Sequence, residues 1–597
     1  MSLQTEIKHL VVQAVEELYD RTIGEEDVTV NQTKPEFQGD YTVVVFQLTR
    51  YSKLSPEDTA RQIGEYLLEN DEDTFERFEV IKGFLNLFIR ETYWLEFLQE
   101  YYDDSTFGRH MAGREKVIVE YSSPNTNKPL HLGHLRNNFL GWSVAEILKA
   151  SGYRVIKTCV VNDRGIHICK SMIAWMKYAH GATPETEGMK GDHFVGKWYV
   201  KFNEVYSQQV KELMAAGKTQ EEAEEQAPIL QEARELLKRW EARDPEVWKV
   251  WEMMNSWVYA GFEETYRRIG SDFDKIYYES ETYLLGKKLV EEGLRKKIFF
   301  KKPDGSIWVD LTAEGLDEKL LLRSDGTSVY ITQDLGLAQL KYDDFGAERS
   351  IYVIGDEQNY HMQVLKLVCQ KLGIPQADGI YHLSYGMVDL PSGKMKSREG
   401  TVVDADDLLD EMKATAEKYT RELGKVEGFQ EQELDALFEM IGQAALKYYL
   451  LRVSPQKRMV FHPGESIDFQ GHTGPFIQYT YARIRSVFRK ARIRTAADLP
   501  FLDDCEEALL TEEKTLIRLL EQYPDQIQQA ADELDPSVLA HYLFEVARMY
   551  NSFYAELPIA KADSEEKKSL RLMISWLTAH VIQSGMQLLG MQVPEKM

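Results

Sequence analysis

The chain has 597 residues, of which 43% are hydrophobic and 28% charged, and it carries a formal net charge of −26 at pH 7. These proportions are those of a large globular protein with several cores, and no run approaches the roughly 18 apolar residues of a membrane span. The acidity argues against DNA coating or packaging, because phosphate contacts need lysine and arginine, but a local basic groove could still bind a specific RNA.

Four cysteines, Cys159, Cys169, Cys369 and Cys505, form no CxxC pair. Neither a zinc knuckle nor a disulfide framework is therefore predicted, and we expect no metal bound by the protein itself. The first residues lack the cationic start and apolar run of a signal peptide. Together with the few cysteines, this predicts a cytoplasmic protein.

Residues 1–110 combine helical patterns at 3–19 and 56–70 with strand-like runs such as YTVVVFQL, which predicts an α+β domain. A different pattern begins at KVIVEYSS, a short β-branched run typical of a buried strand. It is followed by the apolar-periodic LGWSVAEILKASG and by the second buried run YRVIKTCVVND. This order, strand, helix, strand, predicts a doubly wound parallel sheet.

The runs RSIYVIGDE, NYHMQVLKLVCQKLGI and GIYHLSYGMVDL repeat the alternation further along the chain. The α/β domain is therefore predicted to be split into residues 111–170 and 271–402, with a helical insertion at 171–270. Five amphipathic stretches dominate the remainder. We expect a helical linker at 403–470 and an all-α bundle at 471–597.

The stretch TNKPLHLGHLRNN, residues 126–138, lies between the first predicted strand of the sheet and its helix. Ligands of such sheets bind at the carboxyl ends of strands, where helix N-termini present free N–H groups. His131 and His134 share a face if the turn is helical, Gly133 leaves room for a flat group, and Lys128 and Arg136 add charge. This favours a polyphosphate with an adjacent purine over surface histidines at a helix start.

A second cationic stretch, PSGKMKSREGT at 391–401, follows a strand-like run and carries Lys394, Lys396 and Arg398. A mobile loop of this kind could close over a pyrophosphate leaving group. Taken alone, it is more often a solvated basic turn. Neither a P-loop nor a G-x-G-x-x-G fingerprint occurs in the chain, so nucleotide binding must use other residues.

HLGH at 131–134 with KMKSR at 394–398 resembles the HIGH and KMSKS motifs of class I aminoacyl-tRNA synthetases. The runs SSPNTNKPLHLGHLRN, VVNDRGIHICK, SVYITQDLG, YVIGDEQNYHMQ and MKSREGTVV resemble the arginyl-tRNA synthetases in order and spacing over nearly the whole chain. The resemblance implies a catalytic domain of the Rossmann-like, HUP type. In KMKSR the lysine and serine positions are shifted, and the resemblance implies that Lys128 takes over part of the phosphate contact.

The resemblance implies an arginine–tRNA ligase that uses ATP and Mg²⁺ to form arginyl-adenylate and transfers arginine to the 3′ end of tRNA(Arg). It also implies that tRNA binds before arginine is activated. The alternatives are another class I synthetase, a small-molecule adenylyltransferase and a catalytically silent RNA-binding paralogue. We expect a monomer whose partners are tRNA(Arg), L-arginine and ATP, with no DNA and no membrane partner.

A site for free arginine needs carboxylates aimed at a planar cation. Asp334 could instead be a helix N-cap, Glu279 a solvated acid and Tyr330 ordinary packing, but Tyr330 and Asp334 would share a helical face. By resemblance, the arginine-binding residues are Ser123, Asn125, Glu279, Tyr330, Asp334 and Gln358. By the same resemblance, those that bind ATP are His131, Gly133, His134, His361, Met387, Val388 and Lys394.

The run GPFIQYTYARIRSVFRKARIR is the most basic part of the tail. Tyr479 and Arg483 lie one helical turn apart in it, and aromatic rings beside guanidinium groups suit single-stranded RNA loops. The alternative is an amphipathic core helix with a solvated basic face. The resemblance implies that this bundle binds the anticodon, with Met597 near it. It also implies that the linker at 403–470 contacts the RNA stem and that residues 1–110 contact the tRNA elbow. Residues 1–110 themselves are neither basic nor aromatic enough to predict that contact.

Overall fold

The computed structural model describes residues 2–34, 36–389, 391, 403–424, 428–499 and 508–597. Its centre is a five-stranded parallel sheet in the order β12-β11-β5-β6-β7. The middle strand is almost fully buried, as its run of valine and isoleucine requires. The strands are β5 (Lys116–Glu120), β6 (Arg154–Val161), β7 (Lys275–Tyr278), β11 (Arg349–Gly355) and β12 (Ile380–Tyr385).

Strand order reverses between β5 and β11, because the chain first proceeds to β6 and β7 and then returns to the other side of β5. Such a switch point opens a crevice at the carboxyl ends of the strands. The principal helices beside the sheet are α5 (Leu132–Ala150), α6 (Ile166–Tyr178), α14 (Tyr330–Phe345) and α15 (Asn359–Leu372). The predicted split, doubly wound parallel sheet is confirmed.

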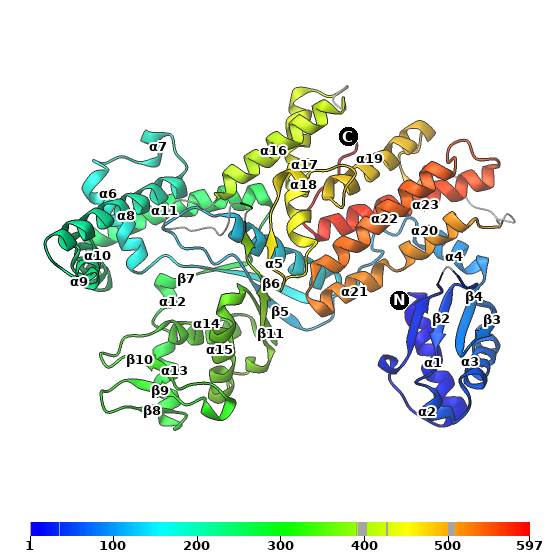
Figure 1. The fold of residues 1–597 in the computed structure, drawn as a ribbon, viewed down its shortest axis with the longest axis horizontal. Helices are drawn as coiled ribbons and strands as arrows, with labels where there is room; N and C mark the ends of the chain where they lie inside the picture. Colours follow the sequence, from blue (N-terminus) through cyan, green and yellow to red (C-terminus); the bar gives the residue numbers. More distant parts are fainter. Residues whose placement is uncertain (1, 35, 390, 392–402, 425–427, 500–507) are drawn as a thin grey trace.

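Between α6 and β7 lies a helical insertion, seen at one end of the molecule in Figure 1. It comprises α7 (Pro184–Glu187), α8 (Gly191–Ala215), α9 (Gln220–Gln226), α10 (Pro228–Glu241) and α11 (Pro245–Ile269). Tryptophans and other aromatic residues of α8, α10 and α11 form much of its core.

A small antiparallel sheet lies between β7 and α14 and was not foreseen from the sequence. It has the order β10-β9-β8. The turn of its hairpin holds Asp304 and Gly305, the latter at φ +93°, which is the turn chemistry that could have revealed it. The strands of this sheet are β8 (Phe299–Lys301), β9 (Ile307–Val309) and β10 (Lys319–Leu322), and the helices α12 (Glu279–Thr282) and α13 (Gly286–Arg295) precede them.

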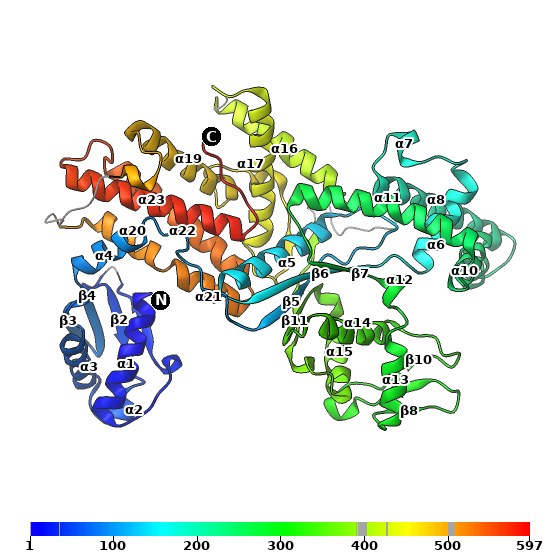
Figure 2. The same ribbon diagram turned by 180° about the vertical axis from the view of Figure 1, so that it is seen from behind.

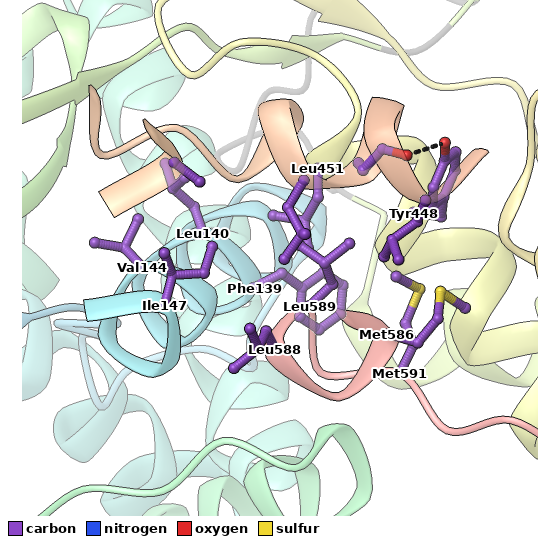
Figure 3. Packing of buried hydrophobic residues seen from close by; sticks show 14 of the residues in the cluster. Phe139, Leu140, Val144, Ile147, Tyr448, Leu451, Met586, Leu588, Leu589 and Met591 are labelled. Atoms are coloured by element: carbon purple, nitrogen blue, oxygen red, sulfur yellow. Dashed lines mark hydrogen bonds between the residues drawn. The ribbon is translucent and has the colours of Figure 1, made fainter. Parts of the chain in front are cut away.

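Helices dominate the chain after residue 403, where only a two-residue strand interrupts them in the described part. Their buried side chains belong to the same hydrophobic core as those of α5 (Figure 3). Helix α5 itself is buried on nearly all sides. The interrupting strand, β14 (Met459–Val460), pairs in parallel with β13 (Val388–Asp389), which precedes this part of the chain. The helices are α16 (Ala405–Glu422), α17 (Glu431–Leu451), α18 (Pro463–Ser466), α19 (Gly474–Ala491), α20 (Thr511–Glu521), α21 (Tyr523–Glu533), α22 (Pro536–Glu556) and α23 (Glu565–Leu588).

The N-terminal domain lies at the opposite end of the molecule from the insertion, beneath α20 and α21 (Figure 2). Its antiparallel sheet has the order β1-β2-β4-β3, and Lys514 of α20 forms an ion pair with Asp40 at 2.9 Å. The elements are α1 (Leu3–Tyr19), β1 (Thr29–Gln32), β2 (Tyr41–Val44), α2 (Thr49–Ser52), α3 (Pro56–Asn70), β3 (Phe75–Ile81), β4 (Phe84–Ile89) and α4 (Glu91–Tyr101). Of the helices within the described ranges, none is long and apolar enough to cross a membrane.

Candidate active site

The two histidines of HLGH form the first turn of α5. His131 is the N-cap residue, and its Nδ1 accepts a hydrogen bond from the Gly133 N–H at 3.1 Å. The Nδ1 of His134 accepts from the His131 N–H at 3.2 Å, and the two ring centroids are 3.9 Å apart. The rings are therefore locked side by side at a helix N-terminus, where free N–H groups favour an anion.

Burial sets the charge of both rings. It lowers the pKa of His131 to about 3, and Lys128 adds to the effect. Burial also lowers the pKa of His134 far below its usual range, and the neighbouring His131 and Lys128 act in the same direction. Both rings are thus neutral at physiological pH, and since each Nδ1 accepts a hydrogen bond, the remaining proton is on Nε2. Each ring offers one N–H donor.

The loop that precedes the histidines is held by side chains of α5. Ser122 and Ser123 have positive φ, at 81° and 43°. The Ser122 N–H donates to the Asn137 side chain at 2.6 Å, and Asn138 donates to the Ser122 hydroxyl at 3.1 Å. Asn137 also donates to the Val353 carbonyl of β11 at 2.7 Å, so the loop is fixed at the switch point of the sheet.

The two cations expected beside the histidines have different roles. Lys128 is partly buried, and desolvation lowers the pKa of its amine. Arg136 is only 2% exposed and donates to the carbonyls of Pro455 and Lys457 at 3.1 and 2.9 Å. The expectation that Arg136 adds charge to the phosphate site is wrong, because its guanidinium holds the segment before β14.

An acidic cavity of about 340 Å³ lies beside β5 and β11. Tyr330 and Asp334, one turn apart on α14, both line it. The Asp334 carboxylate lies 2.6 Å from Nε2 of His361, and this hydrogen bond raises the pKa of His361. Because α14 begins at Tyr330 with Val329 as its N-cap, the N-cap alternative for Asp334 is wrong. Ser123, Gln358 and Asn162 also line this cavity.

A second cavity, of about 720 Å³, adjoins the first, because Asn162 and Tyr330 line both. It also contains Asn125 and Glu279. The Glu279 side chain is only 16% exposed, so the solvated-acid alternative is wrong, and burial raises its pKa to about 7 against the charge of Arg164. Sequence reasoning missed Asn162 and Arg164, although both follow strand β6 at the edge where ligands bind.

The residues predicted to bind ATP do not line one common cavity. His361 stands on the acidic cavity beside Asp334, not beside the paired imidazoles, and the imidazoles are not among the residues that line either cavity. Val388 is buried in β13, and the Met387 carbonyl accepts from the Met459 N–H at 3.2 Å. Lys394, Lys396 and Arg398 lie outside the described residues.

The segment that follows the cationic stretch contacts the HLGH turn through its backbone. The Leu132 N–H donates to the Val403 carbonyl at 3.1 Å, and the Ala405 N–H donates to the Leu130 carbonyl at 3.0 Å. Asp192, His193 and Asp406 gather beside this junction and have the side chains of a metal site. The ammonium of Lys190, 2.6 Å from Asp406, already supplies the cation.

Tyr479, Arg483 and Met597 come together in one cavity of about 410 Å³ in the helical bundle. The Arg483 guanidinium lies 4.9 Å from the Tyr479 ring centroid and 5.3 Å from that of Tyr554. Two other cations of the basic run, Arg485 and Arg489, bond to Glu595 near the C-terminus. One face of α19 is core, as the alternative predicted, but Arg483 and Tyr479 face a hollow.

The N-terminal domain has exposed aromatic residues that the sequence did not single out. Phe37, Phe46 and Phe84 are 46%, 43% and 39% exposed. Phe37 and Phe84 line a shallow cavity of about 200 Å³ together with Asn31, Gln32 and Asn86. Exposed rings beside amide groups are the chemistry that stacks and reads unpaired bases.

These features define a class I aminoacyl-tRNA synthetase. The catalytic domain is a parallel sheet with neutral histidine donors at the start of the helix after its first strand, and the helical bundle that follows has a cavity lined by Tyr479 and Arg483. The family model "tRNA synthetases class I (R), catalytic domain" matches residues 99–462. Models of the DALR anticodon binding domain and of the arginyl-tRNA synthetase N-terminal domain match residues 477–597 and 5–89. The chain belongs to the arginyl-tRNA synthetase family.

Relatives and solved structures agree over full length. The chain is 52% identical to the arginine–tRNA ligase of Bacteroides thetaiotaomicron and 49% identical to that of Porphyromonas gingivalis, each covering 100% of both chains. Its fold matches the arginyl-tRNA synthetase of Thermus thermophilus with a TM-score of 0.80 at 24% identity, covering 100% of both chains. The Plasmodium falciparum enzyme matches with a TM-score of 0.77 at 19% identity, covering 100% of this chain and 99% of that one.

Proposed function

We propose that this chain activates L-arginine with ATP, releasing pyrophosphate, and transfers the arginyl group to the 3′ end of tRNA(Arg). One observation carries the choice of amino acid. Asp334, held by His361, lines a cavity that adjoins a second one containing the buried Glu279. Two carboxylates on neighbouring cavities fit a planar cation that cannot lose its proton.

The arginine pocket is assigned as follows. Asp334 and Glu279 pair with the guanidinium, while Tyr330 forms the wall shared by the two cavities. Ser123, Asn125 and Gln358 are left for the α-amino and carboxylate ends. Lysine is rejected because its ammonium cannot fill both carboxylate forks, and an acceptor left unpaired costs about 1–3 kcal/mol.

On the nucleotide side, the arginine carboxylate attacks the α-phosphate, and the bond to the β-phosphate oxygen breaks. The Nε2–H groups of His131 and His134 donate to the phosphoryl oxygens as charge builds, and Lys128 adds a fixed charge. Gly133, Met387 and Val388 are proposed to contact the adenine. Mg²⁺ arrives on the triphosphate, and Lys394, Lys396 and Arg398 hold the pyrophosphate.

The RNA partner is proposed to contact the helical bundle and the N-terminal domain. Tyr479, Arg483 and Met597 receive the anticodon, and the exposed phenylalanines of the N-terminal domain stack on the tRNA elbow. We propose that the chain acts as a cytoplasmic monomer with no DNA or membrane partner. Tyr479→Ala is expected to raise the KM for tRNA about 10-fold, the cost of one lost base stack, with the KM for arginine unchanged.

Arginine-dependent exchange between ATP and pyrophosphate, measured with and without tRNA(Arg), tests the activity. We expect exchange only with arginine and, because tRNA is expected to bind before arginine is activated, only when tRNA(Arg) is present. Absence of exchange with tRNA present would indicate the silent paralogue, and exchange with a different amino acid would indicate a sister enzyme.

A further inference from the structure

A guanidinium that belongs to the chain itself lies next to the proposed arginine pocket. Arg164 follows β6 and lines the larger cavity, yet its side chain is only 11% exposed. Its guanidinium lies 2.9 Å from Glu241 and 3.7 Å from Glu279, and its carbon is 4.0 Å from the Tyr283 ring centroid. Such a buried cation between two acids needs a reason beyond packing.

The backbone around Arg164 is fixed on both sides. The buried Asp163 accepts hydrogen bonds from the Ser280 N–H at 2.8 Å, the Ser280 hydroxyl at 2.7 Å and the Tyr259 hydroxyl at 2.9 Å. Because Ser280 follows Glu279, the end of β6 is tied directly to the start of α12. Gly165 has φ +106° and ψ −179°, a conformation that L side chains rarely adopt, and it turns the chain into α6.

The helical insertion anchors this guanidinium. Glu241 and Trp240 both belong to α10, and the Trp240 ring centroid lies 5.5 Å from the Arg164 guanidinium carbon. The shorter contact is to Glu241, so the insertion and not Glu279 holds the group in place. Glu279 therefore has the positive charge of Arg164 nearby but forms no close bidentate pair with it, so its carboxylate oxygens stay available to a substrate.

We propose that Arg164 is a positioning residue for arginine recognition, a fixed cation that keeps Glu279 ionised and turned toward the incoming guanidinium. The inference rests on the proposed function. Charges then alternate from Glu241 through Arg164 to Glu279, and from Asp334 to His361 on the far side. The place between Glu279 and Asp334 is the one that fits the substrate cation.

The physical need for Arg164 comes from the burial of Glu279. Desolvation raises the pKa of that carboxyl to about 7, and Asp163 and Asp334 raise it further, while Arg164 opposes them. His167, Glu241, Lys287 and Arg323 are the other ionisable His, Glu, Lys and Arg side chains on the same cavity, and they are common to all the variants tested below except Glu241→Gln. An acid with a raised pKa loses its charge as the pH falls through that value, so arginine binding weakens below about pH 7.

The test is the KM for arginine between pH 6 and 9.5, measured in the Arg-dependent exchange reaction in the presence of tRNA. All variants are made in a His361→Gln background, so that His361 does not titrate over the same range. In the unaltered background, the KM for arginine increases once the pH falls below a threshold. Arg164→Met is expected to shift this threshold to higher pH by about one unit, the usual effect of losing an opposite charge within 4–6 Å. The KM for ATP stays unchanged.

Three further variants sharpen the test. Arg164→Lys keeps the charge and should return most of the pH profile. Glu241→Gln releases the Arg164 guanidinium toward Glu279. The increase in the KM for arginine should then begin at lower pH, a shift opposite to that of Arg164→Met. Arg234→Met, which breaks the exposed ion pair with Glu225 in the same insertion, is the matched control and should change nothing.

The inference is overturned if Arg164→Met raises the KM equally at every pH, or if Arg164→Lys fails to restore the profile while thermal unfolding shows an intact fold. If Arg164→Met does not fold, Glu241→Gln still tests the inference, because the KM for arginine must then begin to increase at lower pH than in the unaltered background. The proposed arginine site fails separately if Glu279→Gln leaves both the KM for arginine and its pH profile as they are.

Discussion

The two sides of the active site both lie at the carboxyl edge of one sheet, yet the charges of their side chains are set in opposite ways. The imidazoles of the HLGH turn are desolvated, whereas the Asp334 side chain on the arginine side is 40% exposed. At the HLGH turn, burial and the charge of Lys128 remove the charge of two imidazoles. At the arginine side, each acid has a partner of its own: the His361 ring is hydrogen-bonded to Asp334, and the Arg164 guanidinium lies beside Glu279. A permanent substrate cation needs permanent anions, whereas charge that appears only in the transition state is better met by neutral oriented donors.

The largest effect is expected at the neutral donors. His134→Asn removes the Nε2 donor while keeping an acceptor for the His131 N–H, and activation should fall about 10²–10³-fold, as for one lost oxyanion donor. His134→Gln places an amide N–H near the Nε2 position and should retain more activity than His134→Asn. Single-turnover formation of arginyl-adenylate measures the difference.

If the two substitutions at His134 were equally inactive, the Nε2–H would not be the functional donor. The rate in the unaltered protein should also show no histidine titration from these rings above about pH 5, because the pKa of His131 is about 3. A rate that falls between pH 6 and 7 in the His361→Gln protein, at saturating arginine, would show that an imidazole titrates there.

Asp334→Asn should be next in size. It removes one carboxylate from the substrate guanidinium, and breaking such a charge pair costs about 2–5 kcal/mol, on the order of 100-fold in kcat/KM for arginine. The KM for ATP should not change. Asp343→Asn, at an exposed position of the same helix, is the control and should behave as the unaltered protein. An equal loss with respect to ATP would mean that Asp334 supports the fold and not the pocket.

Lys128→Ala should cost about 10-fold or more in the activation rate, the value of one charge-assisted hydrogen bond. It should be at least as damaging as Lys394→Ala, because Lys128 is a partly buried cation whose charge acts on both imidazoles. Pre-steady-state adenylate formation compares the two. A harmless Lys128→Ala would assign the phosphate contact to the Lys394 stretch instead.

The smallest effect is expected at His361. Its hydrogen bond with Asp334 raises its pKa, so at low pH the charged ring competes with the substrate, and this competition ends as the pH rises through that pKa. His361→Gln should therefore lower the KM for arginine about 5-fold at pH 6, one ordinary hydrogen bond, and this difference should shrink as the pH is raised. An effect independent of pH would contradict the competition.

Much of the fold was readable from local patterns, since buried β-branched runs and helical periodicity predicted the split parallel sheet and the bundle. The small sheet β8–β10 escaped because its strands have three or four residues, too few to show a period. Spacing correctly predicted that Tyr330 and Asp334 share a helix face, but it could not show that Asp334 pairs with His361 or that Arg136 faces two carbonyls.

The sequence by itself determined the order of the elements and the residue types at the strand ends, because both depend on neighbours within one turn or one strand. Only the tertiary structure decided which of these groups are charged. Desolvation and the nearest counter-charge set the pKa of a side chain, and both come from segments that are distant in the chain, as when α10 of the insertion holds Arg164 against Glu279.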